Sequence, residues 1–309
     1  MAETVDLTAI LSEIGRGQRS ARPLSADAAA QCMRALLHGR VNDLQIGAWW
    51  LAMRLKGESA SELTAFMMEV ERMQAWRINV ANRIPCFVMP AYNGARRLAN
   101  LTPLLVLALR RLGAHVLVHG VEDHPARLTT ATLWRCLGWP VVSNAAQAKA
   151  ALAERGLCFS SIATLHPALA RLLAYRWQIG VRSTPHSLVK LIHPVEGSWR
   201  LVPVTHGDYQ DRLAGWLRQQ DARAFVYRGC EGEPAPHPRR QITLHVCRDS
   251  HVSAEVFYAY ADEDQIETVD CEVTCRLIED VAADRAPLPG HIRRFAEMLH
   301  RNACNHEDR

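Results

Sequence analysis

The stretch Val88-Met89-Pro90-Ala91-Tyr92-Asn93-Gly94-Ala95-Arg96-Arg97 decides the fold. It predicts an apolar strand that runs into a glycine turn, and the turn opens a helix beginning near Leu98. Backbone N–H groups and the positive end of the helix dipole converge at such a turn. Because Arg96 and Arg97 stand where nucleotide enzymes usually have an acid, the stretch predicts an anion site that needs no metal.

The chain around this stretch alternates between short β-rich runs and helices. The expected elements are Pro85–Met89, Leu98–Leu112, His115–Val118, Thr129–Leu137 and Val141–Val142. A helical insertion follows near 165–191, and strands resume at Leu201–Val204, Ala224–Tyr227 and Ile242–His245. The pattern predicts an α/β fold with a central, mostly parallel sheet and ligands at the carboxyl ends of its strands.

The first eighty residues predict a small helical domain. Ser25 or Asp27 starts one helix that runs to Leu37, and Asn42 or Asp43 starts another over Leu44–Leu55. Ser59 and Glu62 have the spacing of a capping box for a third. The pair Trp49-Trp50 is expected to place one ring in the core and one at a helical dimer interface, in preference to stacking on bases. We therefore expect a helical domain over 1–80, with the insertion near 165–191 packed on it, and an α/β domain over 81–309.

Positive charge is concentrated in the first two thirds of the chain. Residues 1–200 hold 23 Lys+Arg and 13 Asp+Glu, whereas 201–309 hold 13 and 19, so a net +10 and a net −6 give the overall +4. Two windows carry arginines without any acid, one between Glu71 and Glu122 and one between Glu154 and Glu196. They predict one composite basic surface. The acids between Asp262 and Asp284 are expected to form a solvated face, with an autoinhibitory strip as the other interpretation.

Composition indicates a soluble cytoplasmic protein. The apolar runs, such as Leu101 to Leu109, are too short to span a bilayer, and the first residues have no basic region ahead of an apolar stretch. Nine cysteines in 309 residues without a dense framework agree with a reducing compartment. Cys271 and Cys275 lack a second pair at zinc-ligand spacing, and the segment with His300, Cys304 and His306 is interpreted as a frayed tail. No metal and no cofactor are predicted.

The order of these motifs resembles anthranilate phosphoribosyltransferase over nearly the whole chain. The motifs are the helical domain, the strand with its glycine turn, Asn100-Leu101-Thr102, His119-Gly120, and later His166-Pro167 followed by Gly180-Val181-Arg182. The resemblance is greatest to a non-catalytic, DNA-binding branch of that family, in which Tyr-Asn-Gly-Ala-Arg is also followed by Ala-Asn-Leu-Thr-Pro. It implies the nucleoside phosphorylase/phosphoribosyltransferase-like fold and a homodimer through the N-terminal helices.

The departures from the enzymes bear on function. The enzymes wrap the pyrophosphate of phosphoribosyl pyrophosphate with Gly-Thr-Gly-Gly-Asp, where this chain has Tyr92 to Arg96; their Lys-His-Gly-Asn is Val118 to Val121 here. Their Asp-Glu magnesium pair falls on Gly229-Cys230-Glu231-Gly232, which leaves Glu231 and Glu233 as the remaining acids. The histidine and the carboxylate-binding arginine of the acceptor region are matched by His166 and Arg182.

These observations predict a protein that binds nucleic acid without sequence preference at the former substrate cleft and performs no catalysis. Single-stranded DNA is the expected partner and RNA the other candidate, because Tyr92, Tyr175 and Trp177 lie near arginines and exposed bases stack on aromatic rings. The predicted phosphate contacts are Asn93, Gly94, Arg96, Arg97, Asn100, Thr102, His119, His166, Arg176, Arg182 and Lys190, with Arg16, Arg19 and Arg22 in a loop suited to closing over a phosphate.

Two other hypotheses stay open at this stage. The chain could be a working phosphoribosyltransferase with an unknown acceptor, which predicts magnesium-dependent binding of phosphoribosyl pyrophosphate. It could also be a scaffold that binds another protein through its apolar N-terminal helices, in which case Arg96→Glu would leave partner binding unchanged.

Overall fold

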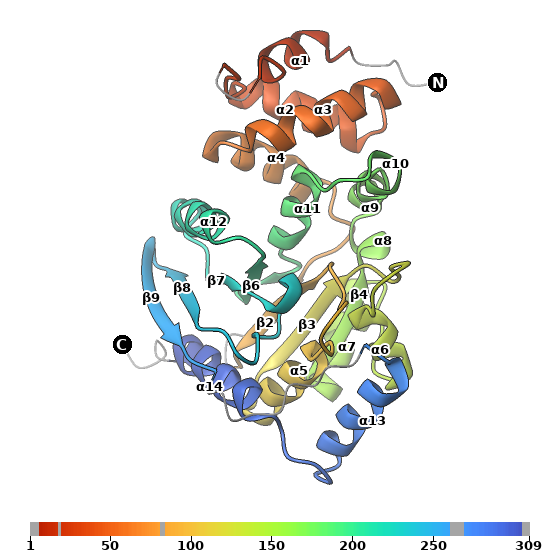
Figure 1. Ribbon diagram of the computed structural model, residues 1–309, viewed down its shortest axis with the longest axis vertical. Helices are drawn as coiled ribbons and strands as arrows, with labels where there is room; N and C mark the ends of the chain where they lie inside the picture. The colour runs from red at the N-terminus through yellow and green to blue at the C-terminus, as the bar shows by residue number, and fades with distance from the viewer. Residues whose placement is uncertain (1–5, 18–19, 81–83, 260–268, 305–309) are drawn as a thin grey trace. The chain divides into compact units, whose positions relative to one another are not determined.

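A computed structural model describes residues 6–17, 20–80, 84–259 and 269–304. The chain divides into two compact units, one comprising Met1–Ala75 with Ile162–Ile192 and the other Trp76–Ser161 with His193–Arg309 (Figure 1). The first unit thus ends five residues before the predicted boundary at residue 80. It includes a second segment that corresponds to the helical insertion.

The first unit is entirely helical. Its helices are α1 (Thr8–Ile14), α2 (Ala26–Leu37), α3 (Asp43–Lys56), α4 (Ala60–Arg72), α8 (Ile162–Leu165), α9 (Pro167–Ala174), α10 (Arg176–Ile179), α11 (Thr184–Leu188) and the 3-10 turn η1 (Val189–Leu191). The side chains of Ser25, Asn42 and Ser59 cap α2, α3 and α4. The capping box of Ser59 and Glu62 is present as predicted. Helix α1 is an addition to the three helices expected.

Both rings of the Trp49-Trp50 pair belong to the core of this unit. Each is 0% exposed, so the prediction that one faces a dimer interface is wrong. Trp49 packs edge-on against Phe66, whereas the Nε1–H of Trp50 donates to the carbonyl of Val181 over 2.9 Å. The second segment of the unit therefore covers Trp50, which the local sequence around the pair could not reveal.

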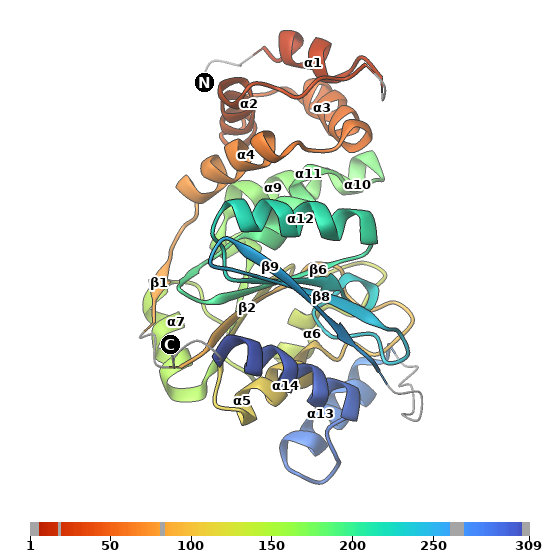
Figure 2. The ribbon, with the colours of Figure 1, turned by 90° about the vertical axis from the view of Figure 1, so that its left-hand side faces the viewer.

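The second unit is built on a seven-stranded sheet (Figure 2). The strands are β2 (Cys86–Ala91), β3 (His115–Gly120), β4 (Leu157–Ser161), β6 (Trp199–Val204), β7 (Ala224–Arg228), β8 (Ile242–Arg248) and β9 (His251–Phe257), in the order β4-β3-β2-β6-β7-β8-β9. The first five are parallel, and β8 and β9 are added antiparallel. A two-stranded parallel pair, β1 (Ile78–Asn79) with β5 (Val195–Glu196), stands apart from this sheet. The predicted mostly parallel sheet is confirmed. Val141, expected in a strand, makes only an isolated bridge to Phe159.

Helices cover both faces of the sheet. Helices α5 (Thr102–Arg111), α6 (Thr130–Cys136), α13 (Cys271–Ala282) and α14 (Gly290–Cys304) share one apolar core with strand residues such as Phe87, Val118 and Phe225. Helix α12 (Gly207–Gln219) lies on the opposite side, as Figure 2 shows, and α7 (Ala145–Arg155) contacts β3 and β4. His300 and Cys304 lie on α14, so the interpretation of this segment as a frayed tail is wrong for them; His306 lies outside the described residues. Within the described part of the chain, every helix is too short or too polar to span a bilayer.

Candidate functional site

The glycine turn follows β2, at the point in the sheet where the strand order reverses. Strand β2 pairs with β3 along its whole length but with β6 only at Phe87 and Val88, so β2 and β6 part towards their carboxyl ends. Such a switch point is where α/β sheets bind ligands. The turn Tyr92–Arg97 leaves β2 there, and the loop Gly229–Ala235, which follows β7, meets it.

The carboxylate of Glu233 occupies the first amides of this turn. Its Oε1 accepts the N–H of Asn93 at 2.7 Å and the N–H of Gly94 at 3.0 Å, and its Oε2 accepts the hydroxyl of Thr130 at 3.1 Å. The residue is only 3% exposed. Glu233 therefore takes the place that an external phosphate would need, which corrects the prediction that the N–H groups of Asn93 and Gly94 are open to an anion.

Glu231 occupies the remaining amides of the turn. Its two carboxylate oxygens accept the N–H groups of Arg96 at 2.5 Å and Arg97 at 3.1 Å, while its own carbonyl accepts the side-chain amide of Asn93 at 2.9 Å. Glu231 has a φ of 53°, a left-handed conformation that a non-glycine residue rarely adopts. We call Glu231 and Glu233 the carboxylate cap. It supplies from a distant segment the acids that the window between Glu71 and Glu122 lacks.

Glycine allows the cap loop to approach so closely. A Cβ on Gly232 would lie 2.0 Å from Nδ2 of Asn93, and the residue has a φ of 82°. The cavity beside the cap, lined by residues including Leu98, Asn100, Glu231 and Glu233, has a volume of about 10 Å³. That is room for about one water molecule. A diphosphate does not fit in this arrangement.

Asn100 and Thr102 have structural roles that also correct where α5 begins. The amide of Asn100 donates to the carbonyl of Leu128 and to the Thr130 hydroxyl, and its oxygen accepts the N–H of Thr102. These bonds, with an antiparallel bridge between Ala95 and Leu128, hold the chain extended past Leu98. The helix therefore begins at Thr102, with Pro103 in its first turn. Both predicted phosphate contacts are buried.

His119 is buried at the carboxyl end of β3. Its Nδ1 lies 2.7 Å from the hydroxyl of Tyr92, and the ring is 0% exposed. Burial lowers the pKa of His119 to about 3, so the imidazole is neutral at physiological pH. A buried, neutral ring offers no charge to a phosphate, and neither it nor Tyr92 is accessible to a base. The predicted phosphate role of His119 is not met in this structure.

The side chains of Arg96 and Arg97 project from the capped turn into solvent. Both residues are exposed, although their backbone N–H groups are bound to Glu231. Within the described ranges, neither guanidinium forms an ion pair at 4.0 Å or less. The cap thus satisfies the backbone N–H groups of the turn with hydrogen bonds. The guanidinium groups of Arg96 and Arg97 remain exposed at the rim of the turn.

A second group of cations gathers in the helical unit. Burial, followed by the charges of Arg182, Arg176 and Lys190, lowers the pKa of His186 to about 3. The three cations are therefore close enough to one ring to act on it together. The Arg176 guanidinium lies 4.8 Å from the ring centroid of Trp177, which is 54% exposed. We call Arg176, Trp177, Arg182 and Lys190 the cationic cluster. Tyr175, by contrast, donates its hydroxyl to Asp43.

The other predicted phosphate contacts of the helical unit differ in how accessible they are to solvent. His166 is 0% exposed: its Nδ1 accepts the N–H of Leu169, and its Nε2 lies 2.9 Å from the carbonyl of Val70. Both ring nitrogens are used inside the unit, so His166 has a structural role in this fold, and its phosphate contact stays a prediction. Arg16 pairs with Glu13 at 2.6 Å, whereas Arg22 is exposed. Arg19 lies outside the described residues.

The contacts of Glu231 and Glu233 with the glycine turn are not predicted by the sequence. Their positions match those of a magnesium pair in the enzymes, whereas both carboxylates accept backbone N–H groups of the glycine turn in this structure. A signal was present, because two acids flank Gly232 within five residues of the end of β7, a strand of the same sheet. Their distance from the turn along the chain concealed the contact.

Comparison with known proteins agrees with this architecture. Residues 8–70 match the helical bundle domain of the glycosyl transferase family. The chain is 36% identical over 296 residues to YbiB of Escherichia coli, described as an uncharacterized protein, and the match covers 94% of this chain and 92% of YbiB. It is 26% identical over 212 residues to the anthranilate phosphoribosyltransferase of Dehalococcoides mccartyi, covering 68% of this chain and 62% of the enzyme.

Solved structures show the same fold. The anthranilate phosphoribosyltransferase of Saccharomyces cerevisiae, in complex with PRPP and Mg, superposes with a TM-score of 0.74 at 14% identity over 97% of this chain and 90% of the enzyme. The enzyme of Thermus thermophilus gives 0.70 at 21% identity over 91% and 93% of the two chains. From its relatives, its fold and its helical domain, the chain belongs to the anthranilate phosphoribosyltransferase-like family of glycosyl transferases.

Proposed function

We propose that this protein binds single-stranded nucleic acid in the cytoplasm, without sequence preference and without transferase activity. The observation that carries the proposal is the carboxylate cap, which occupies the anion-binding amides of the turn and leaves the Arg96 and Arg97 side chains exposed. A diphosphate would have to displace two carboxylates, one of them buried. A polyanion needs only the guanidinium groups at the rim. The nine cysteines, all free, agree with a reducing compartment.

The cationic cluster supports single strands as the ligand. Arginine pairs with phosphate, and an exposed indole such as that of Trp177 offers a surface on which a base stacks. The stack of Arg176 on Trp177 orients both groups. In a duplex the bases are already stacked on one another, so the ring would contribute less. DNA is our first choice, and RNA is the comparison ligand.

Fluorescence anisotropy with a labelled single-stranded oligonucleotide tests the proposal. We expect binding to weaken steeply with salt, since each phosphate contact on a single strand contributes about −0.7 to the slope of log affinity against log salt. The variants Arg96→Glu/Arg97→Glu and Arg176→Glu/Arg182→Glu are each expected to make that slope shallower by about 1.4. Phosphoribosyl pyrophosphate with magnesium should not compete.

The control for charge is Arg218→Glu/Arg276→Glu, which changes the net charge equally at two exposed arginines of the other surface helices α12 and α13. It should leave the salt slope unchanged. Equal losses of affinity in all three double variants would show that net charge alone determines binding. That result would refute a defined nucleic-acid-binding surface. Tight, magnesium-dependent binding of phosphoribosyl pyrophosphate in place of the oligonucleotide would favour an active phosphoribosyltransferase instead.

We also propose that the protein is a homodimer formed through α3. Leu44, Leu51 and Leu55 follow one face of this helix and are 84%, 47% and 66% exposed. A stripe of exposed leucines at helical spacing is typical of a subunit interface. Leu51→Glu is expected to convert a dimer to a monomer in sedimentation equilibrium. Val273→Glu, at a 55% exposed position on α13, should not. A wild-type monomer at all concentrations would contradict the proposal.

A further inference from the structure

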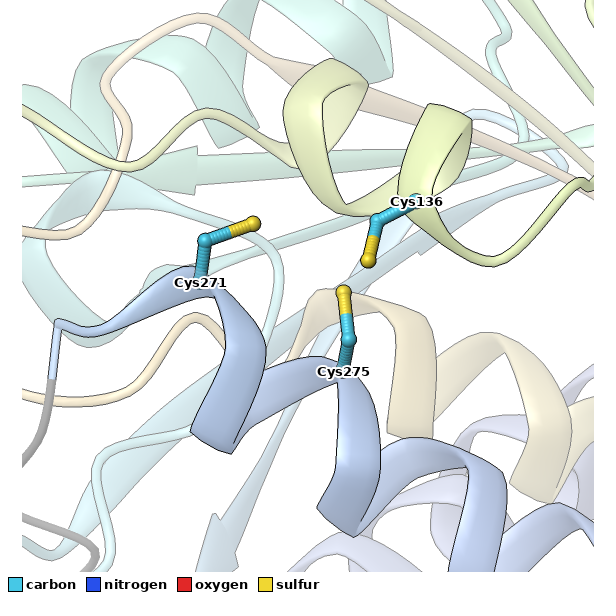
Figure 3. Close-up of side chains that lie close together, drawn as sticks. All are labelled: Cys136, Cys271 and Cys275. Carbon is cyan, nitrogen blue, oxygen red and sulfur yellow. The ribbon is translucent and has the colours of Figure 1, made fainter.

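Three cysteines converge where α6 meets α13 (Figure 3). Cys136 is the last residue of α6, and Cys271 and Cys275 lie one helical turn apart at the start of α13. Their sulfur atoms all lie within 4.8 Å of one another. In Figure 3 the thiols of Cys136 and Cys275 point towards each other and that of Cys271 is directed towards α6. The spacing along the chain concealed this set, because Cys136 is far from the other two.

The distances suit one thiophilic metal ion. Zn–S bonds of about 2.3 Å in a tetrahedral site place sulfur atoms about 3.8 Å apart, and a trigonal site is similar. The observed spread therefore exceeds the required one by about 1 Å, which is within reach of side-chain rotation. Besides the other two thiols, the Sγ of Cys275 has one long contact of 4.0 Å, to the carbonyl of Leu133, among the residues that the structure describes. The three thiols interact with one another, and thiols are weak hydrogen-bonding groups that a metal ion can displace.

The three cysteines differ in solvent exposure. Cys275 is 3% exposed, Cys271 is intermediate and Cys136 is exposed. Asp270 caps α13 by accepting the N–H of Val273 at 2.9 Å, which fixes the helix start that carries two of the three sulfurs. An ion here would have three protein ligands and would reach solvent on the side of Cys136.

From this geometry we propose that Cys136, Cys271 and Cys275 bind one soft metal ion, Zn(II) or Cu(I), as a three-thiolate site. Each thiol releases its proton to solvent as its sulfur bonds to the metal. Three thiolates select these ions over magnesium or calcium, which prefer oxygen. With zinc the fourth position is open to a water. The site joins α6 to α13 and is independent of nucleic-acid binding.

Cobalt substitution tests the site on the reduced, full-length protein. Chelator-treated protein is titrated with Co(II), and a thiolate-to-cobalt charge-transfer band is expected to saturate at one equivalent and to disappear when Zn(II) is added. A parallel titration with Cu(I) against a chromogenic chelator identifies the preferred ion. Cys136→Ser should weaken binding by more than about 100-fold, since changes in the outer shell of a metal already cost 10–100-fold.

Cys136 is the informative position because it is exposed, so its replacement should not disturb the core. Cys275→Ala should also abolish the band, with circular dichroism to verify folding. Cys304→Ser is the matched control, because Cys304 lies 3.6 Å from Nε2 of His300 and is the other thiol beside a possible ligand. Failure to bind one equivalent of either Co(II) or Cu(I) would overturn the proposal. So would a band that survives Cys136→Ser or is lost only in Cys304→Ser.

Discussion

Replacing Glu233 with alanine is expected to destabilise the α/β unit by about 3 kcal/mol. The change leaves the N–H groups of Asn93 and Gly94 and the hydroxyl of Thr130 without their acceptor in a buried place. Each unsatisfied buried donor costs about 1–3 kcal/mol. Differential scanning calorimetry measures the loss as a lower Tm. Formate, which resembles the removed carboxylate, should raise the Tm of the variant and leave the wild-type Tm unchanged.

Glu279→Ala is the control for this experiment, because Glu279 is an exposed acid on a helix of the same unit. Its Tm should stay close to that of the wild type. A wild-type protein that formate, phosphate or phosphoribosyl pyrophosphate stabilises as much as the variant would show that the amides are already accessible. In that case Glu231 and Glu233 would not block the turn in solution, and the proposal that the protein no longer binds a diphosphate would fail.

Replacing Glu62 with alanine is expected to destabilise the helical unit by about 3–5 kcal/mol. Glu62 is 0% exposed, and its carboxylate pairs with Lys56 at 2.6 Å while accepting the N–H groups of Leu24 and Ser59 at 2.9 and 2.8 Å. Alanine leaves the Lys56 ammonium, whose side chain is 8% exposed, without its counter-ion. Amides of α2 to α4 should exchange hydrogen about 100- to 4,000-fold faster, since each step of about 1.4 kcal/mol is a factor of ten, and mass spectrometry can measure this.

Glu13→Ala gives the contrast within the same unit. Glu13 also pairs with a cation at 2.6 Å, but both partners, Arg16 and Glu13, are more than 40% exposed. Solvent screens that pair, so its loss should cost at most about 1 kcal/mol. Equal effects of the two replacements would mean that the Glu62 ion pair is not buried as described.

The helix caps could be predicted from the sequence. Ser25, Asn42 and Ser59 cap their helices with side chains that accept the N–H three residues further on, and such short-range contacts can be predicted from spacing alone. Strand and helix alternation after residue 84 likewise gave the parallel sheet. What failed were contacts between distant segments: the cover over Trp50, the extended chain before Thr102, and Cys136 beside Cys275.

The candidate site shows the same limit in electrostatic terms. A window without acids was interpreted as unneutralised charge, but neutralisation depends on distance in space, and Glu231 and Glu233 reach the turn from beyond β7. The sequence shows which residues carry positive charge, whereas their accessibility depends on burial that spacing does not encode. Asn100, His119 and His166 proved to be internal hydrogen-bonding residues for this reason.

The carboxylate cap has a consequence for how the protein responds to its surroundings. A ligand that binds only the folded state stabilises it, and the stabilisation grows with the logarithm of the ligand concentration. An enzyme with an open diphosphate site is therefore more stable when the diphosphate is abundant and less stable when it is scarce. Here the anion is covalently part of the chain. Its position is fixed by the fold of the Gly232 loop, so the stability of the unit should not depend on the concentration of a diphosphate.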